Sequence, residues 1–163
     1  MREELFAGKI VTLVVEDDHW EIVLHPDSVA VLVADGGHVL GVWQHRAAVG
    51  TRTWEIPAGL IEAGEEPVVA AARELAEEVQ LGGRLKPVIS FYVSPGFTDE
   101  RVHVFELSEP VAVKGHSDDG EELELEWRDA LEVWRAVASG TERTSSTTAL
   151  ALRHLLAARG IEP

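Results

Sequence analysis

The chain has 163 residues, close to the usual size of one domain, and 45% of them are hydrophobic, which is enough to build a core. Its 29 acidic residues outnumber its 14 lysines and arginines, and the net charge of −15 argues against a surface that binds nucleic acid phosphates. There is no cysteine, which excludes a disulfide framework and thiol catalysis.

The N-terminus shows no sign of a targeting segment. Residues 1–5 lack the cationic start and the long apolar run of a signal peptide. No apolar run in the chain approaches the roughly 20 residues needed to cross a bilayer. We therefore expect a cytoplasmic protein with no membrane partner and no nucleic acid partner.

The first part of the chain has the pattern of β-strands. The run 29–34 is almost continuously apolar, which is typical of a strand buried on both faces. Asp17-Asp18 and Asp35-Gly36-Gly37 are turn signals. We expect strands over residues 9–15, 20–25, 29–34, 38–44 and 53–56.

The second part mixes helices with strands. A helix is expected behind Glu65-Glu66-Pro67, because proline is tolerated in a first turn. Ser145 or Ser146 is suited to cap the last helix. We expect strands over 88–93, 102–107 and 123–127, and helices over 129–138 and 148–158. This order of elements predicts an α/β sandwich.

Three glutamates lie on one side of the first predicted helix. At about 100° per residue, Glu74, Glu77 and Glu78 fall within an arc of roughly 100°. The apolar residues of the same helix form a separate arc and comprise Val68, Ala72, Leu75 and Val79. Like charges four residues apart destabilise a bare helix, so this pattern indicates a site for a divalent cation.

These residues also form a known signature. Gly59, then Glu65 after five residues, then Arg73-Glu74-Leu75-Ala76-Glu77-Glu78 after seven more, with Leu81 as a final apolar residue, resembles the Nudix box. The family pattern has a glycine where this chain has Gln80, so we expect Gly82 and Gly83 to end the helix instead.

The resemblance implies a fold. It is a Nudix-type α/β/α sandwich with a mixed β-sheet and an N-terminal antiparallel strand segment. We expect one Nudix hydrolase domain over residues 1–163. About residues 1–27 would form the N-terminal strand segment and contribute to a dimer, and about 28–163 would form the catalytic core.

The resemblance also implies a metal site. Its ligands would be the Ala58 carbonyl, Glu74 and Glu78, with Glu77 close by or bridging, and they would hold two or three Mg²⁺ or Mn²⁺ ions. Arg73 is grouped with the catalytic residues in a positioning role. We expect it to point away from the acid cluster and to pair with Glu65 or another nearby acid.

A second set of motifs resembles one branch of the family. Ser94-Pro95-Gly96 with Glu100, Gln44-His45-Arg46 and the segment 54–59 are similar to the ADP-ribose pyrophosphatases. This resemblance implies metal-dependent hydrolysis of the diphosphate of ADP-ribose, or of a related nucleoside diphosphate sugar. The products would be a nucleoside monophosphate and a sugar phosphate.

The candidate substrate contacts follow from these motifs. Arginine matches phosphate oxygens with two donors, so Arg46 and Arg52 are expected to contact the diphosphate. Glu55 is expected to hold a ribose hydroxyl or an arginine. The branch's loop adds Pro95, Gly96 and Glu100.

A general base must reach the attacking water. In the branch it comes from an acidic loop late in the chain, and Glu121 is our preferred candidate. Glu122 and Asp119 are its substitutes, and a glutamate of the box such as Glu77 is a further one.

Two features of substrate recognition stay open. Adenine needs an apolar or aromatic surface, and Trp20, Trp43 and Trp54 are equal candidates. Members of the branch form homodimers through swapped N-terminal strands, so we expect a homodimer.

Two other functions compete with this hypothesis. One is a Nudix diphosphatase that acts on another nucleoside diphosphate derivative or on a dinucleoside polyphosphate. The other is a Nudix module that binds a nucleotide without catalysis.

Overall fold

The computed structural model describes residues 1–114 and 123–162. The strands are β1 (Arg2–Ala7), β2 (Thr12–Glu16), β3 (Trp20–Leu24), β4 (Ser28–Leu32), β5 (Ala34–Asp35), β6 (His38–Arg46), β7 (Thr51–Glu55), β8 (Ala58–Leu60), β9 (Leu81–Tyr92), β10 (Arg101–Ala112) and β11 (Glu124–Asp129). The helices are α1 (Pro67–Val79), α2 (Ala130–Ala138) and α3 (Ser146–Ala158), and a short 3-10 helix, η1, covers Ala47–Val49.

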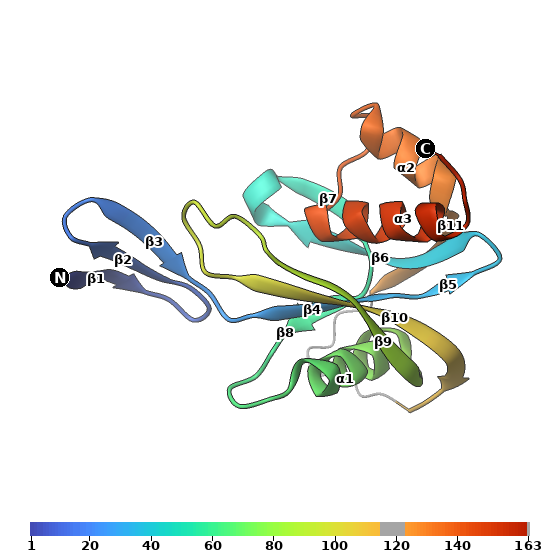
Figure 1. Ribbon diagram of the computed structural model, residues 1–163, viewed down its shortest axis with the longest axis horizontal. Helices are drawn as coiled ribbons and strands as arrows, with labels where there is room; N and C mark the ends of the chain where they lie inside the picture. The colour runs from blue at the N-terminus through green and yellow to red at the C-terminus, as the bar shows by residue number, and fades with distance from the viewer. Residues whose placement is uncertain (115–122, 163) are drawn as a thin grey trace.

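The strands form three sheets. One has the order β1-β2-β3, a second β8-β4-β10-β9, and a third β11-β6-β5 with β7 paired to β6. The second sheet is mixed, because β10 runs parallel to β4 and antiparallel to β9. Figure 1 shows α1 on one side of the central strands and α2 and α3 on the other. The predicted α/β/α sandwich with a mixed sheet and an N-terminal antiparallel segment is therefore confirmed.

The two faces of the central strands bury separate apolar clusters. Alternate residues of a strand point to opposite faces, and β4 supplies both clusters in this way. Ala30 and Leu32 join the cluster beneath α2 and α3, whereas Val29 and Val31 join the cluster against α1. The continuous apolar run of this strand was therefore correctly interpreted as buried on both faces.

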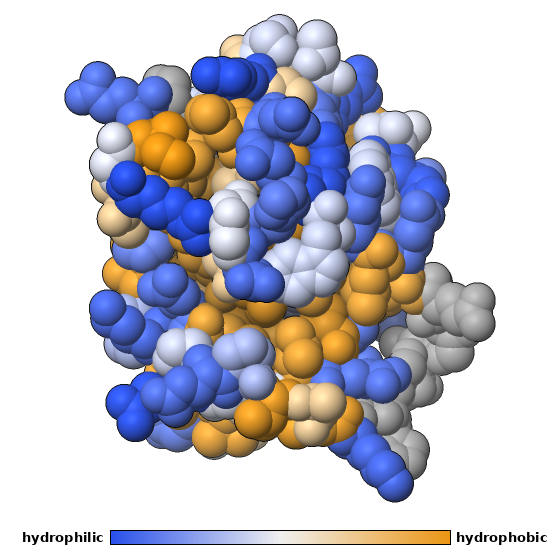
Figure 2. All heavy atoms as spheres, turned by 90° about the vertical axis from the view of Figure 1, so that its right-hand side faces the viewer, coloured by the Kyte–Doolittle hydropathy of each residue, from blue (hydrophilic) through white to orange (hydrophobic). Residues whose placement is uncertain are grey.

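The N-terminal sheet projects from this body (Figure 1). Every residue of β1 is exposed, including Leu5 and Phe6. β3 is joined to the loop between β9 and β10 through Val23 N–H, which donates to the Phe97 carbonyl at 2.7 Å. The His25 N–H also donates to Asp99 Oδ1 at 2.9 Å. The sheet is thus fixed to the loop that carries the Ser-Pro-Gly turn. The opposite end of the molecule mixes hydrophilic side chains with a hydrophobic area (Figure 2).

Several element boundaries differ from the sequence expectation. The strand β1 lies within the predicted N-terminal strand segment, but its bounds were not predicted, because its sequence carries three charged residues among six. The expected helix end at Gly82 and Gly83 was wrong. α1 ends at Val79, and Gln80 itself takes the left-handed conformation with φ 56°. The family's glycine is suited to this position, because glycine adopts that conformation without steric cost. At α3, Ser145 is the N-cap and accepts a hydrogen bond from Thr148 N–H.

Among the described residues, no helix combines the length and the apolar character that crossing a membrane requires.

Candidate active site

The box turn and the box helix meet at Gly59. A Cβ atom at this position would lie 2.0 Å from the carboxyl carbon of Glu74, so any other residue would displace this carboxylate from its present position. One residue earlier, the Ala58 N–H donates to Glu78 Oε2 at 3.1 Å. Gln44 of β6 donates to the other oxygen of Glu78 at 3.3 Å. The turn therefore holds two of the predicted metal ligands against its backbone.

Arg73 connects the acids of the box. Its guanidinium binds Glu65 with two hydrogen bonds of 2.9 and 3.1 Å, as the sequence predicted. It also contacts Glu74 at 2.7 Å and Glu77 at 3.3 Å, and donates to the Leu60 carbonyl at 2.9 Å. The expectation that Arg73 points away from the acid cluster was wrong. Its long side chain bends back along the helix, which an estimate from Cα directions alone does not capture.

Burial perturbs two of these carboxylates. Burial raises the pKa of Glu78 to about 7, although the Ala58 N–H acts in the opposite direction and the charge of Glu74 adds to the rise. Burial likewise raises the pKa of Glu74, while Arg73 lowers it. A negative charge on Glu78 is therefore only partly compensated by protein groups.

These residues fit a hard divalent cation. Carboxylates and backbone carbonyls are the oxygen donors that Mg²⁺ prefers, and the weakly compensated Glu78 is the kind of group that a cation stabilises. Within residues 1–114 and 123–162, no three acidic or histidine side chains are already arranged around one point. Because Arg73 contacts Glu74 and Glu77, loading the site requires these side chains to rearrange.

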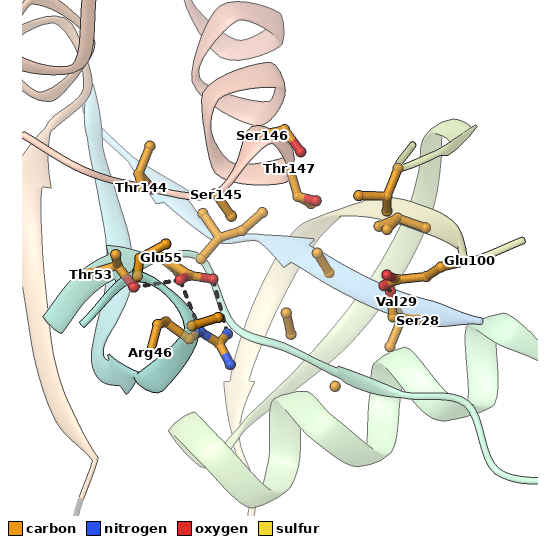
Figure 3. Close-up of a pocket in the computed structure, with 18 of the residues that line it drawn as sticks. Ser28, Val29, Arg46, Thr53, Glu55, Glu100, Thr144, Ser145, Ser146 and Thr147 are labelled. Atoms are coloured by element: carbon orange, nitrogen blue, oxygen red, sulfur yellow. Dashed lines mark hydrogen bonds and ion pairs between the residues drawn. The ribbon is translucent and has the colours of Figure 1, made fainter. Parts of the chain in front are cut away.

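A cavity of about 810 Å³ lies on the other side of the box turn. Ala58, Gly59 and Leu60 of β8 form part of its lining. Figure 3 shows three groups of side chains around it: Arg46, Thr53 and Glu55 at one end, Ser28 and Glu100 at the other, and residues 144–147 above. Four of the predicted site residues, Arg46, Glu55, Ala58 and Glu100, therefore line one cavity.

Arg46 and Glu55 form a paired unit at one end of this cavity. Arg46 Nε and Nη2 each donate to one oxygen of the Glu55 carboxylate at 3.0 Å (Figure 3). Thr53 Oγ1 donates to the same carboxylate at 2.5 Å. Burial acts to raise the pKa of Glu55, but the hydrogen bonds from Arg46 and Thr53 outweigh it and the pKa is lowered. Glu55 thus orients Arg46, and the remaining nitrogen, Nη1, has no hydrogen-bond partner among the described residues.

Glu100 lies at the opposite end. Ser28 Oγ donates to Glu100 Oε1 at 3.0 Å, and His25 Nδ1 lies 3.7 Å from Oε2. The side chain is largely enclosed but remains part of the cavity lining. Its carboxylate is therefore a hydrogen-bond acceptor on the cavity wall.

Three predicted contacts lie outside this cavity. Arg52 is exposed, donates to Glu124 at 2.6 Å and stacks over the Trp43 ring at 5.6 Å. Pro95 and Gly96 line a second cavity of about 480 Å³ together with Trp20. Asp99 lines the second cavity, whereas its chain neighbour Glu100 lines the first.

The three candidate tryptophans differ in accessibility. Trp54 is fully buried beneath α2 and α3 and has no free ring face. Trp43 is partly buried, donates from Nε1 to Glu126 at 2.8 Å and is covered by Arg52 and Arg128. Trp20 is 59% exposed and lines the second cavity. Only Trp20 offers an accessible ring next to predicted substrate contacts.

The preferred general base, Glu121, lies outside the described residues, as do Glu122 and Asp119.

Sequence reasoning missed one wall of the first cavity. It is formed by residues 142–147, between α2 and the first turn of α3. The segment Arg143-Thr144-Ser145-Ser146-Thr147 is rich in hydroxyl groups, and this was interpreted only as a helix cap. Its composition was the available signal, but nothing local shows that it faces the box.

An acidic helix beside a glycine turn and a cavity in an α/β/α sandwich is the arrangement of a hydrolase of the Nudix type. The chain belongs to the Nudix family, since the family described as "NUDIX domain" matches residues 24–149. It is therefore a Nudix hydrolase, and enzymes of this family typically depend on a divalent metal.

Individual relatives agree with this assignment. The chain is 39% identical over 170 residues to an ADP-ribose pyrophosphatase of Bacillus subtilis, covering 94% of this chain and 89% of the relative. It is 39% identical over 113 residues to a methanol dehydrogenase activator of Bacillus methanolicus, covering 63% of this chain and 61% of the relative.

A solved structure supports the fold alone. Its title reads "Crystal structure of ADP compounds hydrolase", and it superposes with a TM-score of 0.76 at 17% identity, covering 98% of this chain and 94% of the other.

Proposed function

We propose that this protein hydrolyses the diphosphate of ADP-ribose, or of a closely related nucleoside diphosphate sugar, to a nucleoside monophosphate and a sugar phosphate. The observation that carries the proposal is that Ala58 and Gly59 of the box turn line the larger cavity and also contact the box acids Glu78 and Glu74. The similarity to an ADP-ribose pyrophosphatase over 94% of the chain supports this choice of substrate.

Glu74, Glu77, Glu78 and the Ala58 carbonyl would hold Mg²⁺ or Mn²⁺. The cation, when bound, neutralises phosphate charge and lowers the pKa of a coordinated water. Arg73 is a positioning residue, because it fixes Glu65, Glu74 and the Leu60 carbonyl relative to one another.

The cavity residues would bind and orient the substrate. Arg46, held by Glu55, would direct its free nitrogen to a phosphate oxygen. Glu100 would accept a hydrogen bond from a ribose hydroxyl. Trp20, beside Pro95 and Gly96, would stack on the adenine ring. Arg52 could reach a phosphate only after leaving Glu124, so we assign it a lesser role.

Hydrolysis forms one P–O bond to water and breaks the bridging P–O bond of the diphosphate. The proton of the attacking water passes to a general base, for which Glu121 is our candidate. We expect Glu121→Gln to lower kcat with little effect on metal affinity. A normal rate would move the role to Glu122, Asp119 or a glutamate of the box.

We also propose a homodimer that uses the N-terminal sheet. This sheet exposes Leu5, Phe6 and Trp20, which is costly for an isolated small sheet. Sedimentation equilibrium of the full chain tests this, and a monomer at micromolar concentration would refute it.

A substrate panel tests the proposed reaction. Purified protein is assayed with Mg²⁺ or Mn²⁺ on ADP-ribose, ADP-glucose, a dinucleoside polyphosphate and a deoxynucleoside triphosphate, and release of AMP or phosphate is followed. We expect the highest kcat/KM with ADP-ribose. Similar values on all compounds would refute the substrate assignment. Binding of ADP-ribose without any product would favour the non-catalytic module.

A further inference from the structure

The wall formed by residues 142–147, hereafter the α3 wall, faces the box turn across the larger cavity. Figure 3 shows residues 144–147 above the gap that separates Arg46 and Glu55 from Glu100. No proposed role in the reaction uses this wall.

Two of its hydroxyl groups already serve the fold. Thr144 Oγ1 donates to the Trp54 carbonyl at 2.6 Å, which ties the wall to β7. Ser145 Oγ accepts from the Thr148 N–H at 3.2 Å and caps α3. These two side chains are therefore structural.

The other two hydroxyl groups have no role in the fold of the described residues. Ser146 and Thr147 line the cavity, and neither side chain forms a hydrogen bond within residues 1–114 and 123–162. Their oxygens lie on the side of the helix turned toward the cavity (Figure 3). A hydroxyl that both donates and accepts suits another hydroxyl as its partner.

A cation lies beside them. Arg143 lines the same cavity and is exposed, and no acid of the described part of the chain lies within ion-pair distance of it. The neighbouring acid, Glu142, is instead bound by two donors of Arg128. Arg143 therefore has donors available for a ligand.

The linings of the two cavities suit different halves of a nucleoside diphosphate sugar. Trp20 lines the second cavity, whereas no Trp, Tyr or Phe of the described residues lines the larger one, so in the proposed binding mode the base stacks on Trp20 and the other half lies in the larger cavity along β8. The group on the second phosphate then continues toward Arg46 and beneath the α3 wall. Ser146 and Thr147, which lie above the middle of the cavity (Figure 3), line it together with Arg143.

We infer that Arg143, Ser146 and Thr147 form a binding site for the hydroxyl groups of the sugar on the second phosphate, and that this site makes the enzyme prefer a sugar ester of ADP. The inference rests on the proposed function and adds to it the residues that select this half of the substrate. A site that hydrogen-bonds substrate hydroxyls discriminates against an analogue that lacks them, because its own polar groups are then left without partners.

The test compares two ADP esters of equal charge. ADP-ribose carries the sugar, and the β-methyl ester of ADP carries a methyl group in its place. The measured quantity is the sugar preference, which is kcat/KM for ADP-ribose divided by kcat/KM for the methyl ester. The full chain is used throughout, and thermal melting checks that each variant is folded.

We expect Thr147→Val to lower the sugar preference about tenfold, because it removes a hydroxyl and keeps the side-chain shape. Thr147→Ser, which restores the hydroxyl, should recover most of the preference. Arg143→Gln should lower the preference several-fold. Arg135→Gln is the matched control, since Arg135 is an exposed arginine of α2 outside the cavity, and it should retain the preference.

An unchanged preference in both Thr147→Val and Arg143→Gln would overturn the inference, as would a wild-type protein that hydrolyses both esters equally well. A wild-type protein that hydrolyses neither ester would instead refute the proposed function itself. Should Thr147→Val fail to fold, Ser146→Ala carries the same expectation at a more exposed position, with a several-fold loss of preference.

Discussion

The larger cavity has two walls that differ in how they are stabilised. The box wall, formed by β8 and the α1 acids behind it, is held by Arg73, by the Ala58 N–H and by the close approach of Glu74 to Gly59. In the α3 wall, the side chains of Glu142, Thr144 and Ser145 are bonded within the fold, whereas those of Arg143, Ser146 and Thr147 have no hydrogen-bond partner among the described residues. The side chains of the box wall are therefore held in place by bonds within the protein. The α3 wall instead offers hydrogen-bond donors that a substrate could contact.

The largest effect should come from the box wall. We expect Glu78→Gln to lower kcat at least a hundredfold while the thermal midpoint stays close to that of the wild type, because this carboxylate is a metal ligand on our assignment. Steady-state kinetics with ADP-ribose at saturating Mg²⁺ measures this. The matched change in the α3 wall, Glu142→Gln, should lower kcat far less. Equal losses of kcat in Glu78→Gln and Glu142→Gln would contradict the assignment of catalysis to the box wall alone.

Gly59→Ala should have the next-largest effect on kcat. Its new Cβ would collide with the carboxyl group of Glu74, so this side chain or the turn must shift. We expect a loss of kcat of at least tenfold with little loss of stability in urea unfolding, because the new Cβ displaces the end of a flexible side chain. The comparison is Gly64→Ala, where a Cβ meets nothing within 4 Å and only the φ of 83° is unfavourable. Its cost should be about 1 kcal/mol with kcat retained. If both variants behave alike, the contact with Glu74 is not what requires glycine.

At the end of the box helix, Gln80→Gly should stabilise the protein by about 1 kcal/mol. Gln80 is in the left-handed conformation, which is unfavourable for a residue with a Cβ and free for glycine. Urea unfolding provides the measurement. A loss of stability would mean that contacts of the glutamine side chain outweigh the backbone cost. The change should leave the sugar preference unaltered, because Gln80 lies outside the α3 wall.

The smallest effect concerns Glu55, which lies between the two walls. Its pKa is lowered in the folded protein, so its ion pair with Arg46 contributes stability that is fully present above the unfolded-state pKa. That contribution is lost as the pH falls through the lowered pKa of the folded state. We expect it to amount to less than about 1 kcal/mol, since Arg46 is partly exposed. Thermal melting of wild type and Glu55→Gln between pH 3 and 7 measures it, and curves that stay parallel throughout would contradict the expectation.

Much of this protein could be predicted from sequence where the evidence is local. The apolar run of β4 predicts its strand. The residue types of Asp17 and Asp18 predict the turn there, and in the structure both residues have φ of 55°. The positions of Glu74, Glu77 and Glu78 follow from the helical repeat. Each of these depends on residues close together along the chain, where backbone geometry leaves few alternatives.

Only the tertiary structure determined which distant groups meet. The long side chain of Arg73 bends along the helix and contacts the carboxylates of Glu74 and Glu77. Arg46 forms its ion pair with Glu55 because the register of β6 and β7 brings the two side chains close together. The α3 wall lies opposite the box turn because α3 packs on the face of the sheet that α1 leaves open. The sequence determines residue types and the periodicity of helices and strands. Whether the box turn and the α3 wall, about ninety residues apart, face each other depends on how the whole core packs.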